Sequence, residues 1–146
     1  MNFEILVFDK THIDDVAALE GLCFSDPYSK ETLARTAESK RDVAFAATVD
    51  GRVVGYIELG NFIDTLCINR VEILPEFRRC GIASALMQRA RQTAAELNIS
   101  ELSLEVRASN TAARALYEKH GFSLAGKRPK YYRDPQEDAA IYILKL

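Results

Sequence analysis

The segment Arg78–Ser84 could bind an anion. Its residues, RRCGIAS, follow a predicted strand that ends at Pro75 and precede a long apolar stripe at helical spacing. The first N–H groups of a helix lack partners within the helix and carry partial positive charge. Gly81 lets a ligand approach the backbone, and Ala83 is nearly as small. This loop is therefore suited to a pyrophosphate group, although a purely structural basic loop with a glycine turn has the same composition.

The loop is not one of the common nucleotide-binding types. It lacks the Gly-Lys-Ser/Thr ending of a Walker loop, and the chain contains no GxGxxG fingerprint.

A second group of polar residues lies further along the chain. Glu105 lies on the face of a predicted strand opposite the alternating residues Leu102, Leu104 and Val106. Asn110 is a candidate N-cap for the next helix, which carries Tyr117. From residue type alone, Glu105 is an ordinary polar side chain that could pair with Arg107 or another base. Tyr117 could be a core tyrosine, and Asn110 only a cap.

Hydrophobic periodicity predicts the elements that position these residues. The order is β-α-α-β-β-β-α-β-α-β-β, which favours one mixed, mostly antiparallel sheet with helices on both faces. The two strands joined through the third helix should be parallel. The predicted strands are Phe3–Phe8, Val43–Val49, Arg52–Leu59, Thr65–Leu74, Glu101–Val106, Ser123–Tyr132 and Asp138–Leu146. The predicted helices begin at a Thr11 cap, at a Ser29 cap, at Ile82 and at Thr111, and end near Cys23, Ser39, Leu97 and His120.

Composition limits the class of protein. The chain has 146 residues, of which 48% are hydrophobic and 27% charged, and its net charge is −2. These values fit one globular domain over residues 1–146 and exclude disordered and fibrous classes. The slight acidity disfavours a protein that coats nucleic acid. Three cysteines without a CxxC pair favour a reducing compartment over a disulfide scaffold or zinc site. No apolar stretch approaches membrane-spanning length, so we expect a cytoplasmic protein without a membrane anchor.

Two stretches resemble the GNAT superfamily of N-acetyltransferases. Arg78, Gly81 and Ala83 fit the family's Arg/Gln-x-x-Gly-x-Gly/Ala acetyl-CoA loop, although many members have glycine at the position of Ala83. The stretch LEVRASNTAARALYEKHGF, Leu104–Phe122, is similar to its strand–helix signature, and in detail to the RimI-type ribosomal-protein-alanine acetyltransferases. The Cys23–Ser29 loop and the Lys127–Arg133 segment share this resemblance, which implies a GNAT fold of the α/β (α+β) class.

The resemblance also implies site residues for direct transfer of acetyl from acetyl-CoA to an amine. Glu105 matches the general base and Tyr117 the general acid, which also contacts the cosubstrate. Glu72 is a rival base, because some members use a carboxylate on that strand. The remaining positions match the pantetheine contacts (Val71, Glu72, Ile73, Asn110), the pyrophosphate loop (Arg78, Arg79, Cys80, Gly81, Ile82, Ala83, Ser84) and the acceptor cleft (Tyr28, Glu105, Tyr131, Tyr132).

The expected acceptor is a protein N-terminal α-amine. By resemblance, it is the N-terminal alanine of a small-subunit ribosomal protein. An α-amine has a pKa of about 7.7–8.0 against about 10.4 for lysine, so a modest base suffices for it. A lysine side chain or a small-molecule amine is the alternative acceptor, and a non-catalytic acyl-CoA-binding or interaction module is a further alternative. No metal, nucleic acid or membrane partner is expected. The basic residues around Tyr131 and Tyr132 are interpreted as a solvated rim.

Overall fold

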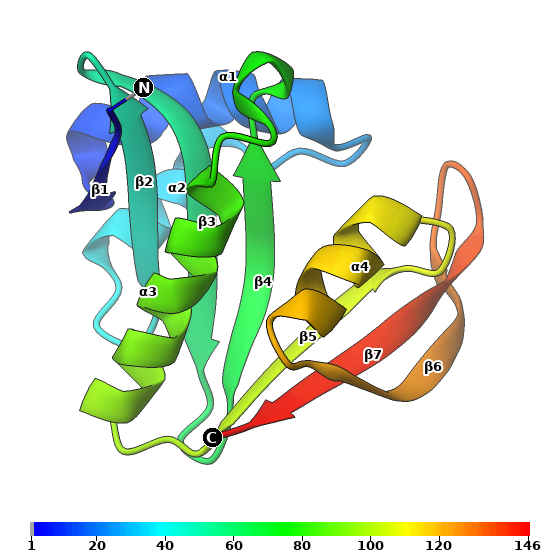
Figure 1. Ribbon diagram of the computed structural model, residues 1–146. Coiled ribbons are helices and arrows are strands. Elements are labelled where there is room, and N and C mark those ends of the chain that lie inside the picture. Colours follow the sequence, from blue (N-terminus) through cyan, green and yellow to red (C-terminus); the bar gives the residue numbers. More distant parts are fainter. Residues whose placement is uncertain (1) are drawn as a thin grey trace.

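The computed structural model describes residues 2–146 (Figure 1). Its strands are β1 (Glu4–Val7), β2 (Val43–Val49), β3 (Arg52–Asn61), β4 (Leu66–Ile73), β5 (Glu101–Arg107), β6 (Ser123–Tyr132) and β7 (Glu137–Lys145). Its helices are α1 (Ile13–Cys23), α2 (Lys30–Glu38), α3 (Ile82–Glu96) and α4 (Thr111–Lys119), with short 3-10 turns η1 (Lys10–His12) and η2 (Pro75–Phe77). The predicted order of strands and helices is confirmed, with boundaries shifted by one or two residues.

The strands form one seven-stranded sheet in the order β1-β2-β3-β4-β5-β7-β6. All neighbours are antiparallel except β4 and β5, which are parallel. This is the pair joined through α3, as predicted, because a helical crossover returns the chain in the same direction. Helices α1 and α2 lie behind the sheet in Figure 1, and α3 and α4 lie in front of it. Within residues 2–146, no helix is long and apolar enough to cross a membrane.

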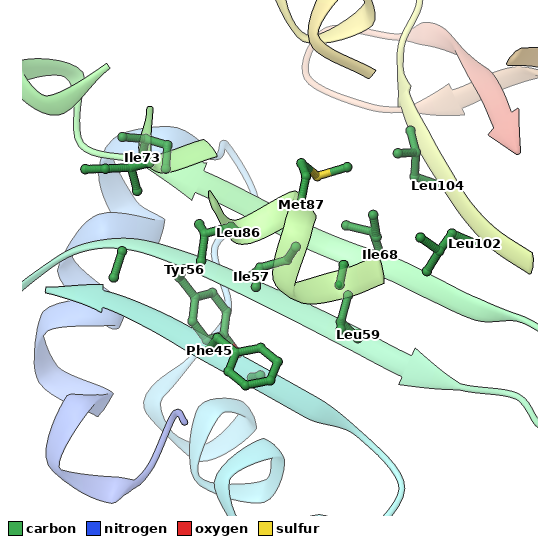
Figure 2. Close-up of a cluster of buried hydrophobic side chains, with 14 of the residues drawn as sticks. Phe45, Tyr56, Ile57, Leu59, Ile68, Ile73, Leu86, Met87, Leu102 and Leu104 are labelled. Atoms are coloured by element: carbon green, nitrogen blue, oxygen red, sulfur yellow. The ribbon is translucent and has the colours of Figure 1, made fainter. Parts of the chain in front are cut away.

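The hydrophobic core lies where α3 packs against the first half of the sheet. Leu86 and Met87 of α3 lie over Ile57 and Ile68 of the strands below (Figure 2). Gly55 permits this close packing, since a Cβ there would lie 3.2 Å from the Cγ2 atom of Ile82 in α3. The core therefore fixes α3, and with it the loop that precedes α3, against the central strands.

The two parallel strands pair over only a short length. Leu66, Cys67 and Ile68 of β4 pair with Leu102, Ser103 and Leu104 of β5, and no later residues of the two strands are paired. Figure 1 shows β4 and β5 separating above this point. The backbone groups of β4 that follow Ile68 thus have no β5 partner on that edge, and they border an opening in the sheet.

One predicted helix cap is wrong and two are confirmed. Asp9, rather than Thr11, provides the first cap: its Oδ1 accepts from the Thr11 N–H at 2.8 Å, and His12 Nδ1 accepts from the Asp9 N–H at 3.0 Å. This reciprocal capping box caps the 3-10 turn η1, and α1 therefore begins only after that turn, at Ile13. Ser29 caps α2 through the Thr32 N–H, and Asn110 caps α4 through the Ala113 N–H, both at 3.1 Å.

Candidate active site

A cleft of about 840 Å³ lies at the opening between β4 and β5. Five segments of the chain contribute to its walls. They are residues 23–26 at the end of α1 and in the loop that follows, 68–71 of β4, 104–107 of β5, the α4 residues Ala113 and Tyr117 with their cap Asn110, and residues 131–134 of the β6–β7 hairpin. The cleft therefore brings together Glu105, Asn110, Tyr117, Tyr131 and Tyr132, whereas Tyr28, Glu72 and the Arg78–Ser84 loop lie outside its lining.

Glu105 projects from β5 into this cleft with 31% of its side chain exposed. The alternation of β5 buries Leu104 and Val106 on the opposite face, as predicted. Arg128 of β6 approaches the carboxylate, with Nε 2.9 Å from Oε2. The alternative partner considered from the sequence, Arg107, instead pairs with Glu137 at 3.3 Å. Glu105 is thus an acidic side chain at the cleft wall. Its basic partner, Arg128, is largely exposed.

Tyr117 lines the same cleft from α4 and is otherwise buried, with 5% of the residue exposed. Its ring packs edge-on against Phe122, with centroids 6.0 Å apart. Burial raises the pKa of the Tyr117 hydroxyl above its usual value. The hydroxyl is therefore protonated near neutral pH and available as a hydrogen-bond donor, so the core and functional interpretations of Tyr117 are compatible.

Asn110 serves as a helix cap and as part of the cleft. Its Oδ1 is used by the Ala113 N–H, which leaves the two N–H donors of the side-chain amide for a ligand.

The loop before α3 has the geometry of an anion site. Arg79 to Gly81 are exposed, and Arg79 and Gly81 have positive φ of 62° and 86°. No side chain caps α3, so the first backbone N–H groups of the helix face outward without a side-chain partner. A Cβ at Gly81 would meet nothing within 4 Å. The space and the charge fit a pyrophosphate group at this helix start.

Glu72 lies behind the cleft rather than in its lining. Its register partner is Tyr56, and its side chain is buried among residues beneath α1 with both carboxyl oxygens unpaired. Burial, together with the neighbouring Glu20 carboxyl, raises the pKa of Glu72 to about 11. At neutral pH Glu72 is therefore protonated and cannot accept a proton.

The three tyrosines predicted for the acceptor cleft differ in position. Tyr131 and Tyr132 line the cleft from the end of β6, with their rings edge-to-face at 5.1 Å. Tyr28 does not line the cleft, and its ring centroid lies 4.0 Å from the Cζ atom of Arg70.

Sequence reasoning missed two arginines that line the cleft, Arg70 of β4 and Arg107 of β5. Arg107 donates to the carbonyl oxygens of Pro135 at 2.8 Å and Arg133 at 2.9 Å, and the Tyr132 ring lies 4.6 Å from its Cζ. It thereby holds the β6–β7 hairpin. The available signal for Arg70 was its position inside the predicted strand Thr65–Leu74, where such a side chain requires partners. Arg107 follows the predicted strand Glu101–Val106 and gave no such signal.

Comparison with known proteins gives consistent similarities. The pattern described as Acetyltransferase (GNAT) family matches residues 13–122. A putative [ribosomal protein bS18]-alanine N-acetyltransferase of Bacillus subtilis is 33% identical over 88% of this chain and 86% of its own length. An N-alpha-acetyltransferase of Sulfurisphaera tokodaii is 30% identical over 93% of this chain and 89% of its own. The crystal structure of the ribosomal-protein-S18-alanine N-acetyltransferase from Escherichia coli superposes with a TM-score of 0.89 and 29% identity, covering 99% of this chain and 94% of that one.

Proposed function

Because the chain belongs to the GNAT acetyltransferase family, we propose that it transfers acetyl from acetyl-CoA directly to the α-amine of a protein N-terminus. The favoured acceptor is the N-terminal alanine of a small-subunit ribosomal protein. Two relatives support an α-amine acceptor: one is named a ribosomal-protein-alanine acetyltransferase and the other an N-alpha-acetyltransferase.

The observation that carries this proposal is the presence of Glu105 and Tyr117 on the walls of one cleft at the opening of the sheet. The same opening exposes unpaired backbone of β4. When bound, acetyl-CoA would supply an activated acetyl thioester. The Arg78–Ser84 loop would hold its pyrophosphate, and the Asn110 amide and the β4 backbone around Val71 would hold its pantetheine arm. Within residues 2–146, no group of three or more His, Cys, Asp and Glu side chains could hold a metal ion.

Glu105 and Tyr117 divide the proton transfers. Glu105, directly or through a water molecule, accepts the proton that the amine loses as it attacks. Tyr117 is protonated and donates its hydroxyl proton to the departing sulfur. Glu72 already carries a proton, which argues against it as the base. Of the two carboxylates considered from the sequence, Glu105 is therefore the one we propose.

At physiological pH, the α-amine of a chain terminus is a better acceptor for this cleft than a lysine side chain, because more of it is neutral. About a tenth of an α-amine is neutral near pH 7, whereas under about a thousandth of a lysine side chain is. The Tyr131 and Tyr132 rings line the cleft beside the cationic side chains of Arg107 and Arg133, which favours a small first residue without a positively charged side chain.

A single peptide that carries both kinds of acceptor amine tests the proposal. It carries a free N-terminal alanine and a single internal lysine, and the acetylated atom is located by fragment-ion mass spectrometry after incubation with acetyl-CoA. We expect acetyl on the α-amine only. Acetyl on the lysine alone would replace the proposal with lysine acetylation.

A further inference from the structure

We propose that Arg70 is the positioning residue for the acceptor wall of the cleft: it holds the loop 24–28 in the shape that receives the acceptor. This inference rests on the proposed function only in taking that cleft as the acceptor site. The residue lies on β4 with 17% of its side chain exposed, and it lines the cleft beside the loop.

The loop between α1 and α2 is held to the rest of the protein by side chains. The Phe24 N–H donates to the Glu20 carbonyl at the end of α1. The other hydrogen bonds of residues 24–28 go to two side chains. The Tyr28 N–H donates to Glu20 Oε1 at 2.7 Å, and the Asp26 carbonyl accepts from Arg70 Nη2 at 2.8 Å. Glu20 and Arg70 are in turn joined at 3.2 Å. One ion pair thus fixes both a donor and an acceptor of the loop.

The aromatic rings of the loop reinforce this hold. The Arg70 Cζ lies 3.9 Å from the Phe24 ring centroid and 4.0 Å from that of Tyr28. Two rings at this distance from one planar guanidinium are favourable cation–π contacts. Phe24 and Tyr28 lie at the two ends of the loop, so Arg70 ties both ends to β4. A lysine would supply the charge without the planar group that these contacts require.

Buried charge requires a cationic partner at this position. Glu20 is fully buried, and an unpaired buried carboxylate is costly. Arg70 Nη2 lies 3.2 Å from Glu20 Oε1, and within residues 2–146 no other basic side chain pairs with Glu20. Glu20 Oε1 is therefore paired with the same arginine that shapes the wall, while the buried Oε2 has no hydrogen-bond partner. Loss of Arg70 should loosen the loop while leaving the start of α3, which the hydrophobic core holds, unchanged.

Four variants separate positioning from general stability. Arg70→Met removes the guanidinium, and Arg70→Lys keeps only its charge. The double variant Glu20→Gln with Arg70→Met avoids leaving a buried charge unpaired, and its new amide still offers an oxygen to the Tyr28 N–H. Arg41→Met is the matched control, because Arg41 also stacks on a ring, that of Phe62 at 4.9 Å, but lies outside the cleft lining.

The first readout is amide hydrogen exchange of the free protein, which does not depend on knowing the acceptor. We expect faster exchange confined to residues 24–29 in all three Arg70 variants, including Arg70→Lys, and none in Arg41→Met. Unchanged exchange in the double variant would overturn the inference, as would normal exchange in Arg70→Lys, because either result would reduce Arg70 to a counter-ion.

The second readout is steady-state kinetics with the α-amine peptide. The three variants should raise the acceptor KM about tenfold or more, with kcat and the Kd of acetyl-CoA near wild type. An equal loss in kcat and acetyl-CoA binding would indicate general destabilisation and contradict the inference. If the wild type acetylates no amine, the proposed function fails, whereas the exchange result still decides the role of Arg70.

Discussion

Replacing Glu72 with glutamine tests the protonation state on which the choice of base depends. Glu72 is 4% exposed, and both of its carboxyl oxygens lack a hydrogen-bond partner. Burial raises its pKa from 4.5 to about 11, with the Glu20 carboxyl acting in the same direction. Between these two values the folded protein holds a proton that the unfolded chain has released.

This proton makes the stability depend on pH with a definite sign. A group with a raised pKa in the folded state contributes fully below its unfolded pKa, and the contribution is lost as the pH rises toward the folded pKa. For one proton the free energy of unfolding falls by about 1.4 kcal/mol per pH unit. Glutamine carries no such proton. From about pH 6 to pH 8, Glu72→Gln should therefore gain about 2.7 kcal/mol relative to wild type.

The assay is urea denaturation of both proteins at a series of pH values. The titrating groups distant from Glu72 are common to the two proteins, so their contributions cancel in the difference; only the neighbouring Glu20 is coupled to the replaced group. Glu76→Gln, which makes the same substitution at an exposed glutamate, is the matched control. Parallel stability curves for wild type and Glu72→Gln would show that Glu72 is ionised in the folded protein, and would refute the reasoning.

Three further substitutions probe the cleft. Glu105→Gln should lower kcat by about 10²–10³, because the base is lost, while Glu72→Gln leaves kcat near wild type in the same assay. Tyr117→Phe should lower kcat by about tenfold or more without changing the Kd of acetyl-CoA, as read by single-turnover and binding measurements. Gly81→Ala places a Cβ at a φ of 86°, which costs about 1 kcal/mol. Its KM for acetyl-CoA should rise with the acceptor KM unchanged, and equal KM values for wild type and variant would contradict the assignment of the loop.

The arrangement of strands and helices was predictable because each element carries its own period. The alternation of Leu102, Leu104 and Val106 and the Ser29 and Asn110 caps are local signals, and all are confirmed. The separation of β4 from β5 after Ile68 was not predicted, since it depends on pairing between strands distant in the sequence.

In the candidate site, too, the contacts between residues distant in the sequence were the ones that could not be predicted. The presence of Glu105 and Tyr117 in one cleft agrees with the resemblance, while their roles stay predictions. The contact of Arg128 with Glu105 reaches from β6 to β5 across the intervening strand β7. The pairing of Glu20 with Arg70 joins residues 50 positions apart. Neither contact leaves a pattern in the local sequence.

Acetyl transfer to a terminal α-amine can be measured as release of free coenzyme A with two matched peptides. One peptide has a free N-terminal alanine and no lysine, and the other has a blocked N-terminus and one internal lysine. We expect thiol release with the first peptide only. Release with the second peptide only, or with neither peptide despite measurable acetyl-CoA binding, would contradict transfer to an α-amine.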